Sequence, residues 1–259
     1  MNLARSNPAK RIPAAALPLA AAAVYAVDFA VAQPGAHASG DSGPGALPER
    51  LSAAARQVFG VKPVADLFAF EVTMIVYALA GWWMKPAMEP RSFTSHRESG
   101  WSAALVGLVL LLLVEGFPVH VMAARAHPML AWLLTAATLY SLLWLFGDFH
   151  GLRLRPMRFT EDALWVRLGL RWNVRVPFAQ IRAVVTPNAE TEAALKRETL
   201  RAVLIGEASV VLELTEPLVA TGPYGLTRRV KRIALAPDDR RAFMAELAAA
   251  LPPCATPRA

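Results

Sequence analysis

The chain has 259 residues, of which 55% are hydrophobic and only 18% are charged, and its mean hydropathy is +0.36. Soluble proteins carry about 25% charged residues, so this composition excludes an ordinary soluble protein and indicates membrane-embedded segments. Residues 1–149 hold 10 Lys and Arg against 9 Asp and Glu, whereas residues 150–259 hold 17 against 11. The basic character therefore belongs to the C-terminal part. The single cysteine, Cys254, excludes a disulfide within the chain.

Four apolar stretches have about the 20 residues that a helix needs to cross a bilayer. They are residues 13–32, 64–84, 101–122 and 128–147. The first is rich in alanine, follows two basic residues and ends in an A-x-A pattern, so it is either an uncleaved span or a cleaved signal peptide. The sequence thus predicts a membrane α-helical bundle of about four transmembrane helices in residues 1–149.

Lys and Arg flank these stretches unevenly. Nine lie at the N-terminal flank, in the second connection and just after the fourth stretch, and four lie in the other two connections. Because cytoplasmic loops are enriched in Lys and Arg, we expect an inner-membrane protein with a cytoplasmic C-terminus and with residues 33–63 on the outer side. Within that connection, the spacing of Leu51, Ala55 and Phe59 predicts either a short amphipathic helix on the outer surface or a plain connector.

The C-terminal part has the patterns of strands followed by one helix. Residues 163–176 alternate between apolar and polar positions with a break at Gly169, which predicts a β-hairpin. Further β-type runs are Ile181–Val185, Leu200–Ile205, Val210–Leu214 and Val230–Leu235. Phe243, Leu247 and Leu251 then recur every four residues, as on one face of a helix. We expect an α+β domain of antiparallel strands closed by one C-terminal helix.

Three segments and the closing helix also carry a resemblance to a known family. They are residues 159–167, 169–172, 176–181 and 238–251. This succession of a strand, a tight hairpin, a proline-marked turn and an isoleucine that opens the next strand resembles the bacterial pleckstrin-homology-like (PH-like) domains fused to membrane helices. The membrane part is similar to uncharacterised bacterial membrane proteins. The resemblance implies a PH-like fold for residues 150–259 much more than a ligand. We expect Trp172 and Phe178 in the core of this domain, and a binding or scaffolding role at the membrane surface.

No catalytic, nucleotide-binding or metal-binding motif occurs, so no cofactor and no metal are expected, and an enzyme hypothesis rests on the predicted spans. Asp28, Glu71 and Glu115 lie in apolar runs, where a charge is costly. Thr135 is predicted at a similar depth, and His120 at the outer end of the third stretch, above Glu115. Together these residues predict either a polar pocket of a small transporter or membrane enzyme, or neutral acids that hydrogen-bond neighbouring helices. In both cases Glu71 and Glu115 are expected to face each other.

Basic residues follow the fourth stretch directly. Arg153, Arg155 and Arg158 are candidates for contact with anionic lipid headgroups. Asp148 and His150 precede them, and their short spacing favours interfacial salt bridges over a metal site. The expected partners are membrane lipids and an unidentified protein. Nucleic acid is not expected, since no nucleic-acid-binding motif is present.

Overall fold

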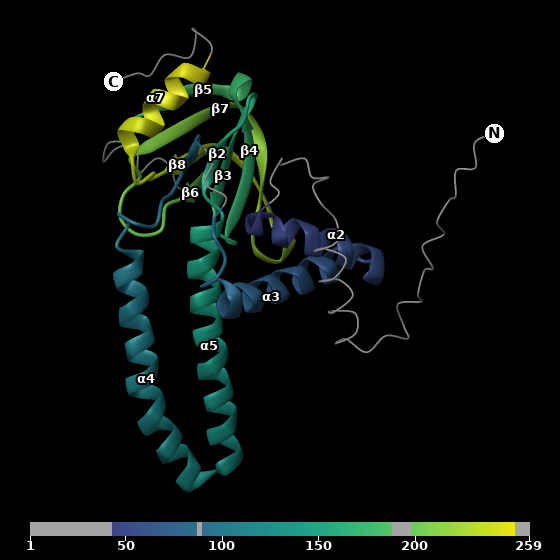
Figure 1. Ribbon diagram of the computed structural model, residues 1–259, viewed down its shortest axis with the longest axis vertical. Helices are drawn as coiled ribbons and strands as arrows, with labels where there is room; N and C mark the ends of the chain where they lie inside the picture. Colours follow the sequence, from purple (N-terminus) through teal and green to yellow (C-terminus); the bar gives the residue numbers. More distant parts are fainter. Residues whose placement is uncertain (1–42, 87–89, 188–197, 252–259) are drawn as a thin grey trace, which may run out of the picture.

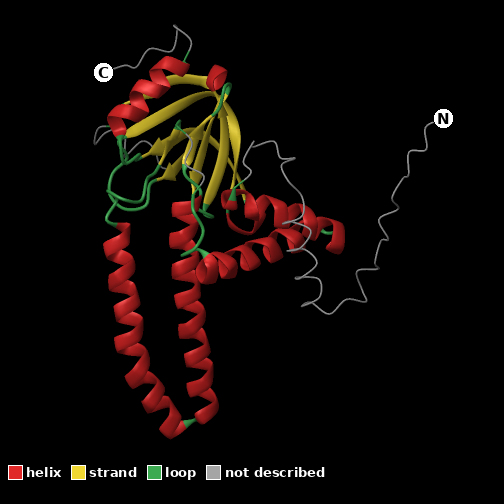
Figure 2. Ribbon diagram, in the orientation of Figure 1, coloured by secondary structure: helices red, strands yellow, loops and turns green. Residues whose placement is uncertain are grey.

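The computed structural model describes residues 43–86, 90–187 and 198–251. They form a short helical hairpin, a long helical hairpin, and an eight-stranded open sheet with one C-terminal helix (Figures 1 and 2). Three helices of this part of the chain are long and apolar enough to cross a membrane. The fourth predicted span, residues 13–32, lies outside the described residues, as do Asp28 and Cys254.

Helices α4 (Trp101–Ala126) and α5 (Pro128–Leu154) form the long hairpin, which projects away from the sheet (Figure 1). They confirm the predicted helices at 101–122 and 128–147, although α5 runs seven residues further. Between the sheet and the tip, most of their apolar side chains are exposed, and Leu105 and Ala131 are exceptions. So large an apolar surface on a single chain indicates a non-aqueous surrounding or a partner.

Helices α2 (Leu47–Phe59) and α3 (Lys62–Ala80) form the short hairpin, and the turn η2 (Pro44–Ala46) precedes them. Gly60 adopts a left-handed conformation, with φ of +69°, and ends α2 in the way that glycine commonly does. Leu51 and Ala54 of α2 pack against Ala69 of α3. The amphipathic helix predicted in this connection is thus present as α2.

Helix α3 lies across α5 near the sheet, and does not run alongside it (Figure 1). Two glycines make the crossing possible. A Cβ at Gly147 would come within 2.4 Å of the Met74 sulfur, and a Cβ at Gly81 within 2.4 Å of the His150 ring. The residue without a side chain is thus Gly147 of α5 at the first contact and Gly81, at the end of α3, at the second.

The sheet has the strand order β1-β2-β3-β4-β7-β8-β6, and β5 also pairs with β7. Its strands are β1 (Ser92–Phe93), β2 (Met157–Phe159), β3 (Ala163–Leu168), β4 (Trp172–Pro177), β5 (Ile181–Val185), β6 (Thr199–Ala202), β7 (Val210–Thr221) and β8 (Thr227–Leu235). The short turns η3 (Phe178–Gln180) and η4 (Pro223–Gly225) precede β5 and β8. The predicted hairpin is confirmed as β3–β4, with Gly169 at φ of +55° in its turn.

The sheet is mixed, which corrects the expectation of antiparallel strands throughout. β6 pairs with β8 in parallel, from Thr199 opposite Arg232 to Ala202 opposite Leu235. The physical reason is the position of β7, which runs antiparallel along one side of β8. β6 precedes β7, runs in the opposite direction to it, and lies along the other side of β8, so β6 and β8 are parallel. Alternation of apolar residues cannot reveal this arrangement, because it is the same in both pairings.

The sheet also takes a strand from outside residues 150–259. β1, in the connection between α3 and α4, pairs with β2, and Phe93 packs edge-on against Phe159 and Phe243. At the other side of the boundary, α5 continues to Leu154 and buries Leu152 in the sheet core. The sheet domain and the long hairpin are therefore joined by shared elements.

Helix α7 (Arg240–Ala250) closes the side of the sheet turned away from the long hairpin (Figure 2). Asp239 caps it, since its Oδ1 accepts a hydrogen bond from the Ala242 backbone N–H at 2.8 Å. Phe243 and Leu247 are fully buried in the core, as predicted. Phe178 is buried as well, whereas Trp172 is half-buried at the margin of the core.

Candidate functional site

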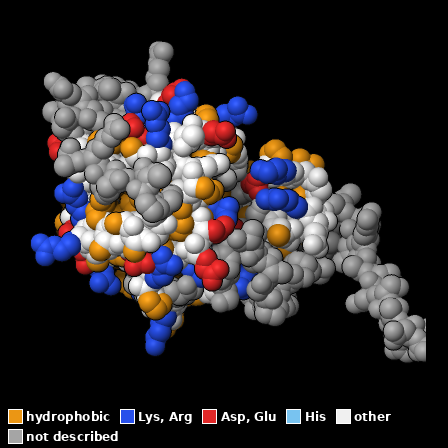
Figure 3. Space-filling view, turned by 90° about the horizontal axis from the view of Figure 1, so that it is seen from above, with side chains coloured by type: hydrophobic (Ala, Val, Ile, Leu, Met, Phe, Trp, Pro, Cys, Tyr) orange, Lys and Arg blue, Asp and Glu red, His pale blue; other side chains and the backbone are white. Residues whose placement is uncertain are grey.

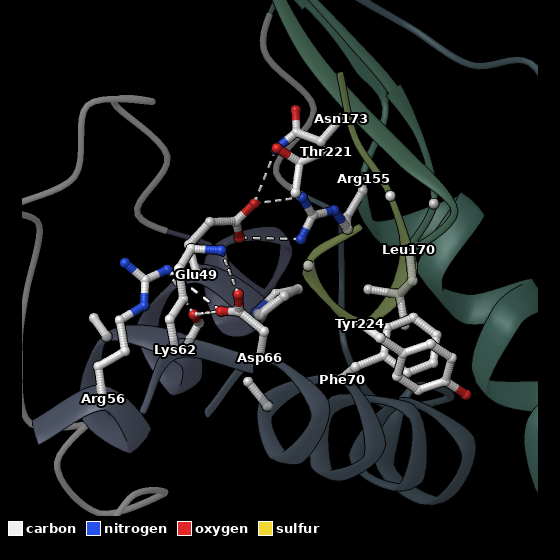
Figure 4. A pocket seen from close by; sticks show the side chains of 17 residues that line it. Glu49, Arg56, Lys62, Asp66, Phe70, Arg155, Leu170, Asn173, Thr221 and Tyr224 are labelled. Atoms are coloured by element: carbon white, nitrogen blue, oxygen red, sulfur yellow. Dashed lines mark hydrogen bonds and ion pairs between the residues drawn. The ribbon is translucent and has the colours of Figure 1, made fainter. Parts of the chain in front are cut away.

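A cleft of about 390 Å³ opens where the α2–α3 hairpin meets the sheet domain (Figure 4). One wall comes from α2 and the first half of α3. The facing wall comes from the end of α5, the β3–β4 turn and the β7–η4 connection. Its principal lining side chains are Glu49, Arg56, Lys62, Asp66, Phe70, Arg155, Leu170, Asn173, Thr221 and Tyr224.

An ion pair between the buried Arg155 and the partly exposed Glu49 joins the two walls of the cleft. Both terminal nitrogens of Arg155 donate to the Glu49 carboxylate, at 3.0 and 2.5 Å, and Asn173 Nδ2 donates to the same carboxylate at 3.2 Å. Only 3% of Arg155 is exposed. Burial alone would raise the pKa of Glu49, but the attraction and hydrogen bonds of Arg155 outweigh it and hold that pKa below its usual value. Glu49 therefore stays ionised at neutral pH.

A second charged group surrounds Asp66 on the α2–α3 side. Lys62 Nζ donates to its Oδ2 at 2.7 Å, Ser52 Oγ to its Oδ1 at 2.5 Å, and Arg56 lies 3.4 Å from the same Oδ1. The cations are more than half exposed, whereas the Asp66 side chain is almost buried. Charges of both signs thus line the cleft, with the cations at its rim.

The apolar part of the cleft is built around Tyr224. Its ring packs on Phe70 of α3, with the ring centroids 4.3 Å apart. Its backbone is left-handed, with φ of +56°, which is uncommon for any residue but glycine and is sustained only by surrounding contacts. The next residue, Gly225, leaves no room for a side chain, since a Cβ there would meet the Asp66 carboxylate at 2.3 Å. The η4 turn is therefore fitted closely to α3.

The sequence predicts that residues 33–63 and the C-terminal domain lie on opposite sides of the membrane, whereas α2 packs directly on the sheet domain. Glu49 of this helix is ion-paired with Arg155 and hydrogen-bonded by Asn173, so α2 lies on the same side of the long hairpin as the sheet domain. Counting positive charges could not reveal this, because the count presumed that residues 64–84 cross the membrane.

Glu71 is held by two tyrosines. Tyr140 of α5 donates its hydroxyl to both carboxylate oxygens, at 3.2 and 3.0 Å, and Tyr224 donates to Oε1 at 3.2 Å. Glu115, in contrast, lies on an exposed side of α4. The expectation that Glu71 and Glu115 face each other is therefore wrong: Glu71 joins α3 to α5 and η4, and this agrees with hydrogen bonding between helices.

His120 and Thr135 do come together near the tip of the long hairpin. His120 Nδ1 lies 2.5 Å from Thr135 Oγ1, and Thr135 also donates to the Ala131 carbonyl at 3.0 Å. Both side chains line an open, mainly apolar groove between α4 and α5 of about 390 Å³, which includes neither Glu71 nor Glu115. The described residues of the predicted polar pocket therefore do not form one pocket. Glu71 contacts two tyrosines, and His120 contacts Thr135.

The three arginines after the fourth predicted span differ in their surroundings. Arg155 is buried against Glu49, and the half-buried Arg153 donates to the Gly81 carbonyl and, at 3.1 Å, to the Met84 carbonyl. Arg158 is half-buried in β2. Arg155 and Arg153 therefore join α5 to the short hairpin and to the segment that follows it.

Of the two residues expected in salt bridges at the end of α5, Asp148 forms one, and its partner is Arg171. Arg171 of the β3–β4 turn donates to both oxygens of the buried Asp148, at 2.9 and 2.8 Å, and its guanidinium lies 4.6 Å from the Trp101 ring centroid. In the part of the chain that the structure describes, no group of three or more His, Cys, Asp or Glu could hold a metal ion.

Figure 3 shows the molecule from the sheet end, where Lys and Arg side chains are scattered among Asp and Glu side chains. The charge of this face is mixed, so the excess of Lys and Arg after residue 149 does not gather there into one patch. The cleft beside α2 is therefore a better candidate for a binding site than this face of mixed charge.

Glu49, Asp66 and Tyr224 are not among the site residues predicted from the sequence. Asp66 could have been found, because it lies in the same apolar run as Glu71 and four residues after Lys62, the spacing of a helical ion pair. Glu49 and Tyr224 leave no such signal. Glu49 depends on α2 meeting Arg155 and Asn173, which lie 106 and 124 residues later, and Tyr224 depends on η4 meeting Glu71 of α3, which lies 153 residues earlier.

The fold and the cleft define a sheet domain tied to apolar helices, as expected for a protein that works at a membrane. Comparison of the chain with models of protein families, with curated proteins and with solved structures found no match.

Proposed function

We propose that this chain is an inner-membrane protein that holds a binding module at the cytoplasmic surface. The α4–α5 hairpin is the anchor, and the α2–α3 hairpin with the sheet domain forms the module. The observation that carries this proposal is the position of the cleft, at the junction of all three parts and with charged side chains on both walls. A PH-like identity of the sheet domain belongs to the same proposal, supported by its hairpins and its closing helix.

The lining of the cleft favours an amphiphilic ligand that carries a charge. Arg56 and Lys62 present exposed cations at the rim, and Phe70, Leu170 and Tyr224 supply apolar surface inside. Its volume lies within the range of about 300–1,000 Å³ that small-molecule sites usually have. The class of ligand that we propose is an anionic lipid or a similar amphiphile, because such molecules are concentrated at this surface.

Photocrosslinking in native membranes tests the proposal. Ala53 lines the cleft and is exposed, whereas Gln57, one turn further along α2, is exposed but outside the lining. A benzophenone side chain at position 53 should give a lipid adduct that the same group at position 57 does not give. Arg56→Glu together with Lys62→Glu should weaken the adduct. A protein adduct specific to position 53 would replace the lipid by a protein partner, and equal adducts at both positions would overturn the cleft as a binding site.

A further inference from the structure

Helix α3 carries an apolar stripe that no described element covers. Leu67, Ile75 and Leu79 follow one another at spacings of eight and four residues, so they share one helix face with Glu71, and Val64 lies beside them. All four apolar side chains are exposed, from 41% at Ile75 to 60% at Leu79. The neighbouring face, which includes Phe70, Met74 and Tyr77, is buried against the rest of the molecule.

Both ends of α3 are attached to the sheet side of the molecule. Near its beginning, Asp66 fits against Gly225 and Phe70 packs on Tyr224, both in η4. Beyond its end, Arg153 at the base of the sheet domain donates to the Gly81 and Met84 carbonyls. A helix of 19 residues is about 28 Å long and would span a bilayer only if its two ends lay on opposite sides. These contacts place them on the same side.

The apolar stripe faces along the long hairpin, toward its tip. Glu71, in the middle of the stripe, accepts hydrogen bonds from Tyr224 of η4 on the sheet side and from Tyr140, which lies 14 residues before the end of α5 at Leu154 and thus away from the sheet. Phe70, on the neighbouring face, contacts Tyr224 of the sheet domain. The stripe therefore turns toward the region that the exposed apolar surfaces of α4 and α5 occupy.

We infer that α3 is an in-plane helix at the membrane surface, although its composition would allow it to cross. The exposed stripe of Val64, Leu67, Ile75 and Leu79 lies in the acyl region of the leaflet beside the sheet domain. Among the described residues, the chain then crosses the bilayer with α4 and α5 alone. The stripe adjoins the part of α5 on which α3 packs, so the same leaflet contacts α3 and that part of α5.

Two features next to the stripe fit such a position. Trp82 and Trp83 follow α3 directly and are exposed, and tryptophan is enriched at the headgroup level of membranes. Glu71, the only acid in the stripe, has its carboxylate bound by two tyrosine hydroxyls, which satisfies its oxygens at the boundary. An amphipathic helix of this kind binds through its apolar face and leaves its other face to the protein.

Depth measurements on the full chain in proteoliposomes distinguish the two placements. In a Cys254→Ser background, nitroxide labels are attached to Leu67→Cys and Leu79→Cys, and their exposure to oxygen and to a water-soluble nickel chelate is compared. These positions are 12 residues apart, so a spanning helix would separate their depths by about 18 Å. An in-plane helix gives nearly equal depths. Gln57→Cys on α2, an exposed position outside α3, serves as the water-exposed control.

Sidedness gives a second, independent measurement. Arg56→Cys on α2 and Lys231→Cys on β8 are both exposed. An impermeant maleimide should label both from the same side of the membrane and His127→Cys, at the hairpin tip, from the other. Labelling of Arg56→Cys together with His127→Cys, or a depth difference near 18 Å, would show that α3 spans the bilayer and would overturn the inference.

Discussion

At the scale of single residues, His96 shows how the connection after α3 is fixed to the sheet domain. It is buried beside Asp238, whose carboxylate accepts the backbone N–H groups of Arg97 and Glu98 at 3.1 and 3.0 Å. Burial lowers the pKa of His96, and the positive charges of Arg97 and Arg153 lower it further, which outweighs the attraction of Asp238. His96 is therefore neutral in the folded protein at neutral pH.

This shift predicts a loss of stability in mild acid. An unfolded chain binds a proton at His96 near pH 6.5, whereas the folded protein binds it only at lower pH, so the unfolded state takes up more protons as the pH falls below 6.5. The melting temperature in detergent should fall between pH 7 and pH 5.5, and His96→Gln should reduce that fall.

A matched control is His127→Gln, which changes the exposed histidine at the hairpin tip. It should leave the acid sensitivity as it is. Asp238 has a lowered pKa, because the hydrogen bonds from Glu98, Thr94 and Arg97 outweigh burial, so its contribution is lost only as the pH falls below about 4. His96 and Asp238 therefore affect stability in different pH ranges, His96 below about 6.5 and Asp238 below about 4. An unchanged profile in His96→Gln would contradict the assignment.

At the scale of elements, the core of the sheet domain depends on segments that are far apart in the sequence. Phe243 of α7 has ring contacts with Phe93 of β1 and Phe159 of β2, with centroid distances of 5.3 and 5.2 Å. Arg91, next to β1, forms an ion pair with Glu246 of α7. A fragment that begins at residue 150 lacks β1 and these contacts, so it is not a complete sheet domain.

Truncation of Phe243 should destabilise the domain strongly. Phe243→Ala removes a fully buried ring and leaves a cavity among aromatic neighbours, which costs about 3–5 kcal/mol. Met244→Ala, on the half-buried side of the same helix, should cost clearly less. Hydrogen exchange of β2 and β3 in the full chain measures both effects. Equal protection in the two variants would mean that α7 does not close the core as described.

At the scale of the whole molecule, the distribution of basic residues orients the long hairpin. Between Trp101 and Leu152, Arg125 at the tip is the only Lys or Arg, whereas both ends at the sheet domain are followed or preceded by several. Because α2 also lies on the sheet side, its basic residues add to that side. The asymmetry across α4 and α5 is therefore larger than the four-span interpretation suggested, and it favours a cytoplasmic sheet domain.

Reporter fusions test this orientation. A reporter that is active only in the periplasm should be silent after Ala259 and active when inserted at His127 in the hairpin tip. The same fusions with a reporter that is active only in the cytoplasm should give the reverse pattern. Periplasmic activity after Ala259 would invert the orientation and place the binding module on the outer side.

The sequence by itself determined the apolar helices, the β3–β4 hairpin and the closing helix, because each depends on local periodicity and on a turn or cap within a few residues. It also located Glu71, His120 and Thr135 as polar residues in apolar surroundings. Tertiary structure alone decided that β6 runs parallel to β8, that β1 completes the sheet, and that α3 lies across α5. The cleft belongs to this second group. Its Glu49–Arg155 pair joins residues more than 100 positions apart, and only the packing of α2 on the sheet domain brings them together.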